Sequence, residues 1–188
     1  DNNNNPSSPR PVSMPPSLQK AWTELVLPLL RRPERMQVSA LCHRRDASGK
    51  TEILLITSRG TGRWILPKGW PIDGLSGAQA AHMEAWEEAG VAEGAIGQKP
   101  LGDFGYSKEL GGGPPVPCRA YVYPIRVLRM DDDYPEAAER DSIWVTPAKA
   151  ATMVDEPELR AILADPELMT KATAQEGMIL RARTSDTI

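Results

Sequence analysis

The 188-residue chain carries 22 basic and 25 acidic side chains, which gives a net charge of −3. This balance provides no overall attraction to nucleic acid or to an anionic membrane, so any basic site must be local. The two cysteines, Cys42 and Cys118, exclude a disulfide framework and a thiolate zinc site and indicate a reducing compartment. No apolar run approaches the roughly 18 residues of a membrane span, and the first residues lack the apolar core of a signal peptide. We therefore expect a soluble, cytoplasmic protein with no membrane or nucleic-acid partner, and the oligomeric state stays open.

The domain limits follow from composition. Residues 1–17 are rich in Asn, Ser and Pro and are predicted to form a disordered N-terminal arm. Residues 18–30 are apolar at a helical spacing until Pro28, which fits either a short helix or an apolar strap. We predict a single domain over residues 18–169 and a polar, peripheral C-terminal tail over residues 170–188.

Strand signals dominate the middle of the chain. The predicted strands are 35–45, 51–59, 63–67, 99–110, 116–130 and 142–145. The first two form a hairpin, and the glycine-rich segment 111–115 is a connector or a lid. Helices are predicted over 77–89, after Thr146 as N-cap, and over 157–166. Because helices interrupt the strands irregularly, we predict an α+β fold with a mixed sheet.

The helix over 77–89 carries an unfavourable group of charges. Glu84, Glu87 and Glu88 share one helix face, where like charges repel by a few tenths of a kcal/mol per pair. They also lie near the C-terminal end, where the helix dipole disfavours negative charge. Either this is an ordinary solvated acidic face, or a divalent cation compensates it, since Mg²⁺ and Mn²⁺ prefer oxygen ligands. The turn at Lys68 and Gly69 could add a backbone carbonyl to such a site.

This stretch resembles the Nudix box, G-x5-E-x7-R-E-U-x-E-E-x-G-U, where U is a bulky aliphatic residue. The matching positions are Gly69, Glu84, Glu87, Glu88, Gly90 and Val91. Leu75 stands where the family has Glu, Met83 stands where it has Arg, and Ala85 is smaller than usual. In the family that Glu and Arg commonly form a salt bridge. Because replacing both partners by apolar residues can be neutral, we predict that Leu75 and Met83 form an apolar brace.

The resemblance extends over about residues 35–165 and is closest to the diphosphoinositol polyphosphate and diadenosine polyphosphate hydrolase branch. Arg119 stands where that branch has a phosphate-binding Arg, and Arg140 and Trp144 match a later acidic-turn pattern. The resemblance implies an α/β/α sandwich around a mixed sheet, with the box as a loop–helix–loop. It also implies hydrolysis of a small-molecule polyphosphate at a diphosphate bond, with Mg²⁺ or Mn²⁺ as cofactor.

The resemblance assigns roles to individual residues. Glu84, Glu87 and Glu88 are implied as catalytic metal ligands, with Glu88 the main ligand and Glu84 also a candidate base. The carbonyl of Gly69 or Lys68 is implied to complete the metal shell. Cations that could bind the phosphates are Arg45, Arg59, Arg63, Lys68 and Arg119.

Two alternatives remain open. The substrate could instead be ADP-ribose or a nucleoside triphosphate, or the protein could bind a nucleotide without cleaving it, which the Leu75 and Met83 departures favour. His82 is predicted to be a solvated surface residue, and His43 has no partner histidine. The aromatic residues Trp64, Trp86, Phe104 and Tyr106 are predicted to pack, although Phe104 and Tyr106 could stack on a base.

Overall fold

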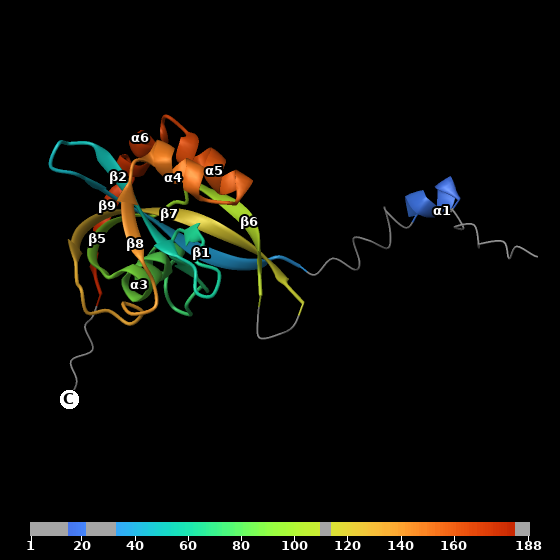
Figure 1. Cartoon of the computed structure of the whole chain (residues 1–188), viewed down its shortest axis with the longest axis horizontal. Helices are drawn as coiled ribbons and strands as arrows, with labels where there is room; N and C mark the ends of the chain where they lie inside the picture. The colour runs from blue at the N-terminus through green and yellow to red at the C-terminus, as the bar shows by residue number, and fades with distance from the viewer. Residues whose placement is uncertain (1–14, 22–32, 110–113, 183–188) are drawn as a thin grey trace, which may run out of the picture. The chain divides into compact units, whose positions relative to one another are not determined.

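A mixed β-sheet organises the computed structural model, which describes residues 15–21, 33–109 and 114–182 (Figure 1). In the described residues the strand order is β3-β2-β1-β7-β5-β9, with β4 on β1, β6 on β7 and β8 on β2. The central strands β1 and β7 are parallel, whereas the other pairs are antiparallel. The strands are β1 (Arg35–Arg45), β2 (Thr51–Thr57), β3 (Trp64–Ile65), β4 (Lys68–Gly69), β5 (Val91–Gly97), β6 (Gly102–Lys108), β7 (Val116–Met130), β8 (Ser142–Val145) and β9 (Glu176–Arg181).

Helices cover both faces of the sheet. Figure 1 shows α3 (Gly77–Ala89) on one side and α4, α5 and α6 on the opposite side. Strand residues alternate between the two layers: Val38 and Ala40 of β1 belong to the core cluster that includes the alanines of α3, whereas Leu41 belongs to the cluster with the later helices. The helices are α3 (Gly77–Ala89), α4 (Pro147–Met153), α5 (Pro157–Ala164) and α6 (Leu168–Thr173). This arrangement confirms the predicted α+β class and α/β/α sandwich.

Helix α3 begins and ends where its local sequence predicts. The Ser76 side chain accepts a hydrogen bond from the backbone N–H of Gln79, and the Gln79 side chain reciprocates on the Ser76 N–H. The chain leaves the helix at Gly90, whose φ of 74° is left-handed and suits glycine. Thr146 likewise caps α4, with Pro147 in its first turn.

The chain divides into two compact units, residues 1–33 and 34–188. In the first unit, α1 (Pro16–Ala21) is helical, so a helix begins two residues before the predicted 18–30 segment. Residues 1–14 of the predicted disordered arm and residues 22–32 of the apolar segment lie outside the described residues. The predicted domain start at residue 18 is wrong, because residues 18–33 belong to the first unit.

The predicted C-terminal tail contains structured residues. Ala172 of α6 is buried and β9 pairs with β5, while residues 183–188 lie outside the described residues. The strand β5 went unpredicted because its glycines and alanines carry little strand signal. Both strands exist through long-range pairing, which a local pattern does not reveal.

Other expectations concern smaller features. Both cysteines are buried and unpaired. The predicted connector or lid, residues 111–115, lies largely outside the described residues, which resume at residue 114. Within the described ranges, no helix has the length and apolar character needed to cross a membrane.

Candidate functional site

The turn that begins the box is held against the sheet. Strand β4 pairs with β1, so that Gly69 lies opposite Val38 and Lys68 lies opposite Ser39. The Ser39 hydroxyl donates to the carbonyl of Pro67 over 3.1 Å, which fixes the chain just before β4. This pairing presents the Lys68–Gly69 backbone to the carboxylate face of α3.

Glu84 packs directly on that backbone. A Cβ atom at Gly69 would overlap the Glu84 carboxylate, so no larger residue fits there without moving the acid. Burial, reinforced by the charges of Glu88 and Glu87, raises the pKa of Glu84 to about 7. The carboxylates of Glu84, Glu87 and Glu88 therefore repel one another on this helix face, as predicted.

Glu88 is held by two neighbours. Its Oε2 accepts a 2.9 Å hydrogen bond from the Lys68 backbone N–H, and its Oε1 pairs with a guanidinium nitrogen of Arg140. Burial raises the pKa of Glu88, and the nearby Arg140 charge opposes that rise. Glu88 and Glu84 thus both meet the Lys68–Gly69 turn.

Arg140 reaches Glu88 because the loop that carries it is tied to α3. The Glu136 N–H donates to the Glu87 carbonyl over 3.0 Å, directly at the end of the helix. The Arg140 side chain is only 4% exposed and also donates to Glu136 over 2.5 Å and to the Thr57 carbonyl over 2.9 Å. Two acids and one carbonyl therefore neutralise and orient this buried cation.

A basic pocket of about 510 Å³ adjoins the carboxylates through Glu88 and Lys68. Its charged and polar lining comes from the β2–β3 turn, from β4, from the end of β6 and from the loop before β8. These residues are Ser58, Arg59, Thr61, Arg63, Lys68, Glu88, Tyr106, Ser107, Lys108, Glu109 and Arg140. Five cations face two acids there, which favours a polyanionic ligand.

Three of the predicted phosphate-binding cations meet in this pocket. Arg59 lies 3.1 Å from Glu139, and Arg63 lies 3.4 Å from Asp155. Since these arginines are exposed, their ion pairs are weak and can be exchanged for phosphate. Lys68 lies 5.1 Å from the centre of the Tyr106 ring, and burial lowers its pKa to about 8.

The other two predicted cations do not reach the pocket. Arg119 is bound by Glu34 at 2.7 Å, Asp103 at 2.6 Å and Glu158 at 3.6 Å. Arg45 lies six residues along β1 from Ser39, or roughly 20 Å at the rise of a strand. Neither arginine lines the basic pocket, because a strand's sequence does not reveal which loops will surround each residue. Their roles as phosphate ligands stay predictions.

The pocket also contains cations that the sequence did not assign to it. Lys108 ends β6, and no local signal distinguishes it from an ordinary surface lysine. Arg140 was visible as part of the acidic-turn pattern, but only the tertiary structure brings it to Glu88.

The predicted apolar brace of Leu75 and Met83 stays a prediction. Leu75 is 40% exposed and lines a groove with Met36, Tyr121 and Tyr123. The box loop is held by the pairing of β4 with β1.

The predictions for the aromatic side chains and for His82 have different outcomes. Phe104 and Trp86 are buried in the core, as predicted. Tyr106 packs against that core and also lines the basic pocket. The prediction that His82 is solvated is wrong: it is 2% exposed, with its ring against Gly94 of β5. That face of α3 is covered by a strand that the sequence did not predict.

The residues at the turn fit a divalent cation only in part. In the described ranges, no three acidic, histidine or cysteine side chains converge closely enough to hold an ion by themselves. The oxygens of Glu84 and Glu88 nevertheless share the Lys68–Gly69 turn. The pKa of Glu84 is raised mainly by burial and also by the charges of Glu88 and Glu87, and a cation would offset the latter. Substrate phosphates and waters commonly supply the other ligands of Mg²⁺. The three carboxylates as metal ligands stay a prediction.

Residues 35–165 match the NUDIX domain. Since this match covers more than half of the chain, the protein belongs to the NUDIX domain family. Its box departs from the family pattern at Leu75 and Met83.

Two relatives from Arabidopsis thaliana are similar in sequence. The protein named Nudix hydrolase 12, mitochondrial, is 31% identical over 113 residues, which cover 56% of this chain and 53% of that protein. Nudix hydrolase 13, mitochondrial, is 28% identical over 141 residues, which cover 70% of this chain and 66% of that protein. The chain thus spans between about half and two thirds of the length of these relatives.

Two solved structures are also similar. One is an Ap4A hydrolase from C. elegans, with a TM-score of 0.48 and 22% identity, covering 76% of this chain and 98% of that chain. The other is a NUDIX hydrolase from Nitrosomonas europaea, with a TM-score of 0.49 and 15% identity, covering 77% of this chain and 92% of that chain.

Proposed function

We propose that the protein hydrolyses a phosphoanhydride bond in a nucleoside or inositol polyphosphate, with the help of a divalent cation. One observation carries this proposal: two carboxylates of α3 meet the Lys68–Gly69 turn at the edge of a pocket that contains five cations. Membership of the NUDIX domain family supports it, and both Arabidopsis relatives bear the name Nudix hydrolase.

The residues of the turn and helix would divide the chemistry. Glu84, Glu87, Glu88 and the Gly69 carbonyl would hold Mg²⁺ or Mn²⁺, which when bound would neutralise charge on the diphosphate oxygens. Glu84, with a pKa of about 7, is suited to accept the proton of an attacking water near neutral pH. Arg140 keeps Glu88 in place through the hydrogen bonds described above.

The pocket cations would bind the phosphates that do not react. Arg59, Arg63 and Lys108 lie in the pocket with flexible side chains, and arginine forks match phosphate oxygens. So many cations favour a highly charged substrate, such as a diadenosine polyphosphate or a diphosphoinositol polyphosphate. ADP-ribose and nucleoside triphosphates form the alternative substrate class, and of these ADP-ribose, with two phosphates, carries the least charge.

A second candidate function is binding of a nucleotide without cleavage. The observation that favours it is the pairing of Glu88 with Arg140, which occupies the carboxylate expected to be the main metal ligand. In that case the pocket would bind polyphosphates equally well with and without Mg²⁺.

Incubating the purified chain with Mg²⁺ or Mn²⁺ and a substrate panel distinguishes these functions. The panel contains diadenosine polyphosphate, a diphosphoinositol polyphosphate, ADP-ribose and a nucleoside triphosphate, with products identified by ³¹P NMR. We expect metal-dependent cleavage that Glu84→Gln and Glu88→Gln abolish. Glu167→Gln, at an exposed acid just before α6, should leave it unchanged. Binding of the panel without any cleavage would refute the hydrolase and support the second function.

The compartment is a separate proposal. The reduced, buried cysteines fit a cytoplasmic protein, whereas the two Arabidopsis relatives are named as mitochondrial. Imaging of a fluorescent fusion of the full-length protein would decide between these compartments.

A further inference from the structure

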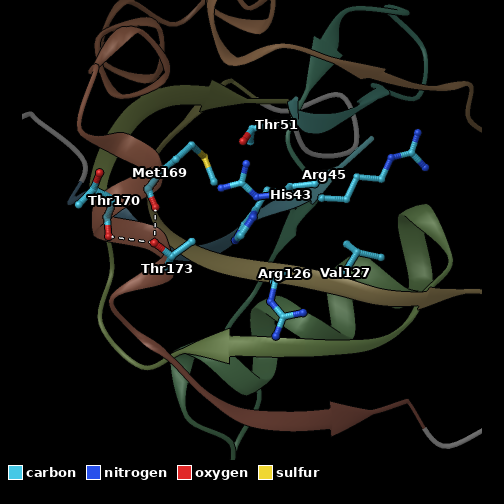
Figure 2. A pocket seen from close by; sticks show the side chains of 9 residues that line it. His43, Arg45, Thr51, Arg126, Val127, Met169, Thr170 and Thr173 are labelled. Carbon is cyan, nitrogen blue, oxygen red and sulfur yellow. Dashed lines mark hydrogen bonds between the residues drawn. The ribbon is translucent and has the colours of Figure 1, made fainter. Parts of the chain in front are cut away.

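A second cavity, of about 420 Å³, lies at the other end of β1 (Figure 2). His43 and Arg45 of β1 line it together with Arg126 of the neighbouring β7, and Thr170 and Thr173 of α6 line it as well. The register confirms that His43 and Arg126 are direct neighbours across the two strands. This cavity shares no lining residue with the basic pocket beside Glu88.

His43 is the unusual residue of this cavity. It is 3% exposed, and its Nε2 atom has no hydrogen-bond partner within the described part of the chain. Buried polar atoms in folded proteins nearly always have a partner, so an unpaired one requires an explanation. Burial lowers the pKa of His43 to about 4, so the neutral ring offers one donor and one acceptor.

The charges that line the cavity are all basic. Arg45 donates to the Gly49 carbonyl over 2.9 Å and makes no ion pair with a carboxylate of the described residues. Arg44 also lines the cavity and pairs with Glu52 at 2.9 Å. Arg126 pairs at 2.5 Å with Glu176, which does not line the cavity but whose charge acts on His43. Arg45 is thus the lining cation without an acidic partner among the described residues. The cavity therefore keeps a positive charge that an anion would neutralise.

The remaining lining suits an anion with an organic part. The volume lies within the range of roughly 300–1,000 Å³ typical of small-molecule sites and exceeds that of a lone ion. Val127 and Met169 provide an apolar wall, and Thr51, Thr170 and Thr173 add hydroxyls around it. Donors approaching from two strands and a helix match the several oxygens of a tetrahedral anion better than the two oxygens of a carboxylate.

We propose that this cavity binds a small phosphomonoester, with Arg45 and Arg126 contacting the phosphate and His43 satisfied by the ligand. The site is separate from the proposed hydrolytic site and does not depend on hydrolysis. The ligand's organic part lies against Val127 and Met169.

Imidazole NMR provides a local test, because the chain contains only two histidines. Full-length protein is titrated with adenosine monophosphate and, separately, with inorganic phosphate, while both histidine side chains are observed. We expect the His43 signals to shift and saturate, with tighter binding of the monoester, while the signals of His82 under α3 stay fixed. Unchanged His43 signals would overturn the site, and equal affinity for both probes would overturn the contact with an organic part.

Matched variants separate this cavity from other basic surfaces. Arg45→Gln removes one charge-assisted contact and is expected to weaken the His43-detected affinity about tenfold. Arg126→Gln is a second variant with the same expectation, in case the first disturbs the hairpin. Arg129→Gln, on the same strand β7 but paired with Glu93 and Asp131, is the control. Arg63→Gln in the basic pocket must also leave this affinity unchanged, and a loss there equal to that of Arg45→Gln would contradict a separate site.

Discussion

Buried polar groups near the two ends of the central strand β1 differ in whether they have hydrogen-bond or ion-pair partners. At the end beside Lys68, the buried acid Glu88 has a backbone donor and Arg140 as partners. At the other end, the buried Nε2 of His43 has no partner among the described residues. Matched charges make the first region a rigid, pre-organised site, whereas the unmatched nitrogen leaves the second region open to a ligand. A variant that changes one of these regions should leave the other unchanged.

Removing Arg140 should have the largest effect on stability. Arg140→Met leaves the buried Glu88 without its cation and the half-buried Glu136 with only Arg59, and breaking one side of a buried ion pair typically costs about 3–5 kcal/mol. Urea denaturation at pH 7 measures this free energy of unfolding. A cost below about 1 kcal/mol would show that the network behaves like a surface pair.

Acid should destabilise the fold through His43. Its folded pKa of about 4 lies below its unfolded value of 6.5, so below pH 6.5 the unfolded chain binds more protons and stability falls until pH reaches about 4. Glu176, Arg126 and Arg45 face the ring, but burial is the dominant cause of the shift. Between pH 7 and pH 5 we expect this group to remove about 2 kcal/mol of stability.

The matched variant for this pH effect is His43→Leu, which replaces a buried ring without an Nε2 partner by an apolar side chain. Between pH 7 and pH 5 the free energy of unfolding of His43→Leu should fall by about 2 kcal/mol less than that of the wild type. Urea denaturation of both proteins at the two pH values provides the comparison. Parallel losses in both proteins would assign the acid sensitivity to other groups, such as His82, whose pKa burial also lowers.

Gly69→Ala should affect turnover more than folding. The added methyl group would displace the Glu84 carboxylate from the turn, and a misplaced catalytic group lowers kcat by at least about tenfold. Gly74→Ala in the loop before α3 is a poor control because its φ is positive. Gly177→Ala in β9 is the matched control, since its φ is not positive and a Cβ atom there makes only an ordinary contact with the Gln175 carbonyl. Steady-state kinetics would detect the loss, and wild-type kcat in Gly69→Ala would contradict the role of this turn.

Arg119→Gln should have the smallest effect. Arg119 of the central strand β7 is bound by three acids and does not line the basic pocket, so kcat/KM should change less than about twofold. Arg63→Gln is the comparison, since Arg63 does line the pocket and its loss should raise KM. If Arg119→Gln raised KM as much as Arg63→Gln, the arginine would have to reach the substrate after rearrangement.

Local signals predicted some elements well. Helix α3 has the predicted bounds because Ser76, Gln79 and Gly90 act within a few residues of its ends. Strand β7 also has its predicted bounds, because its long alternating pattern fits no other element. By contrast, β5 is held by its pairing with β7 and β9, and β9 is held by its pairing with β5, and no local signal predicted either strand.

In the candidate site, too, local sequence signals identified some residues and missed others. Glu84 and Glu88 were found from their spacing on one helix and their match to the Nudix box, and both meet the predicted turn at Gly69. The cations were found only in part: Arg59, Arg63 and Lys68 reach the pocket, and Arg119 and Arg45 do not. A charge on a strand or loop carries no information about which distant segment it will face.

The sequence by itself determined the family and the carboxylate helix, because these depend on the spacing of residues within one segment. The helices on both faces of the sheet were implied by the resemblance to the family and not by any strand pattern. Only the tertiary structure decided that Arg140 holds Glu88, that Lys108 joins the pocket, and that His43 lies buried beside Arg126. Those contacts depend on strand order and on the parallel pairing of β1 with β7, which bring together residues far apart in the chain.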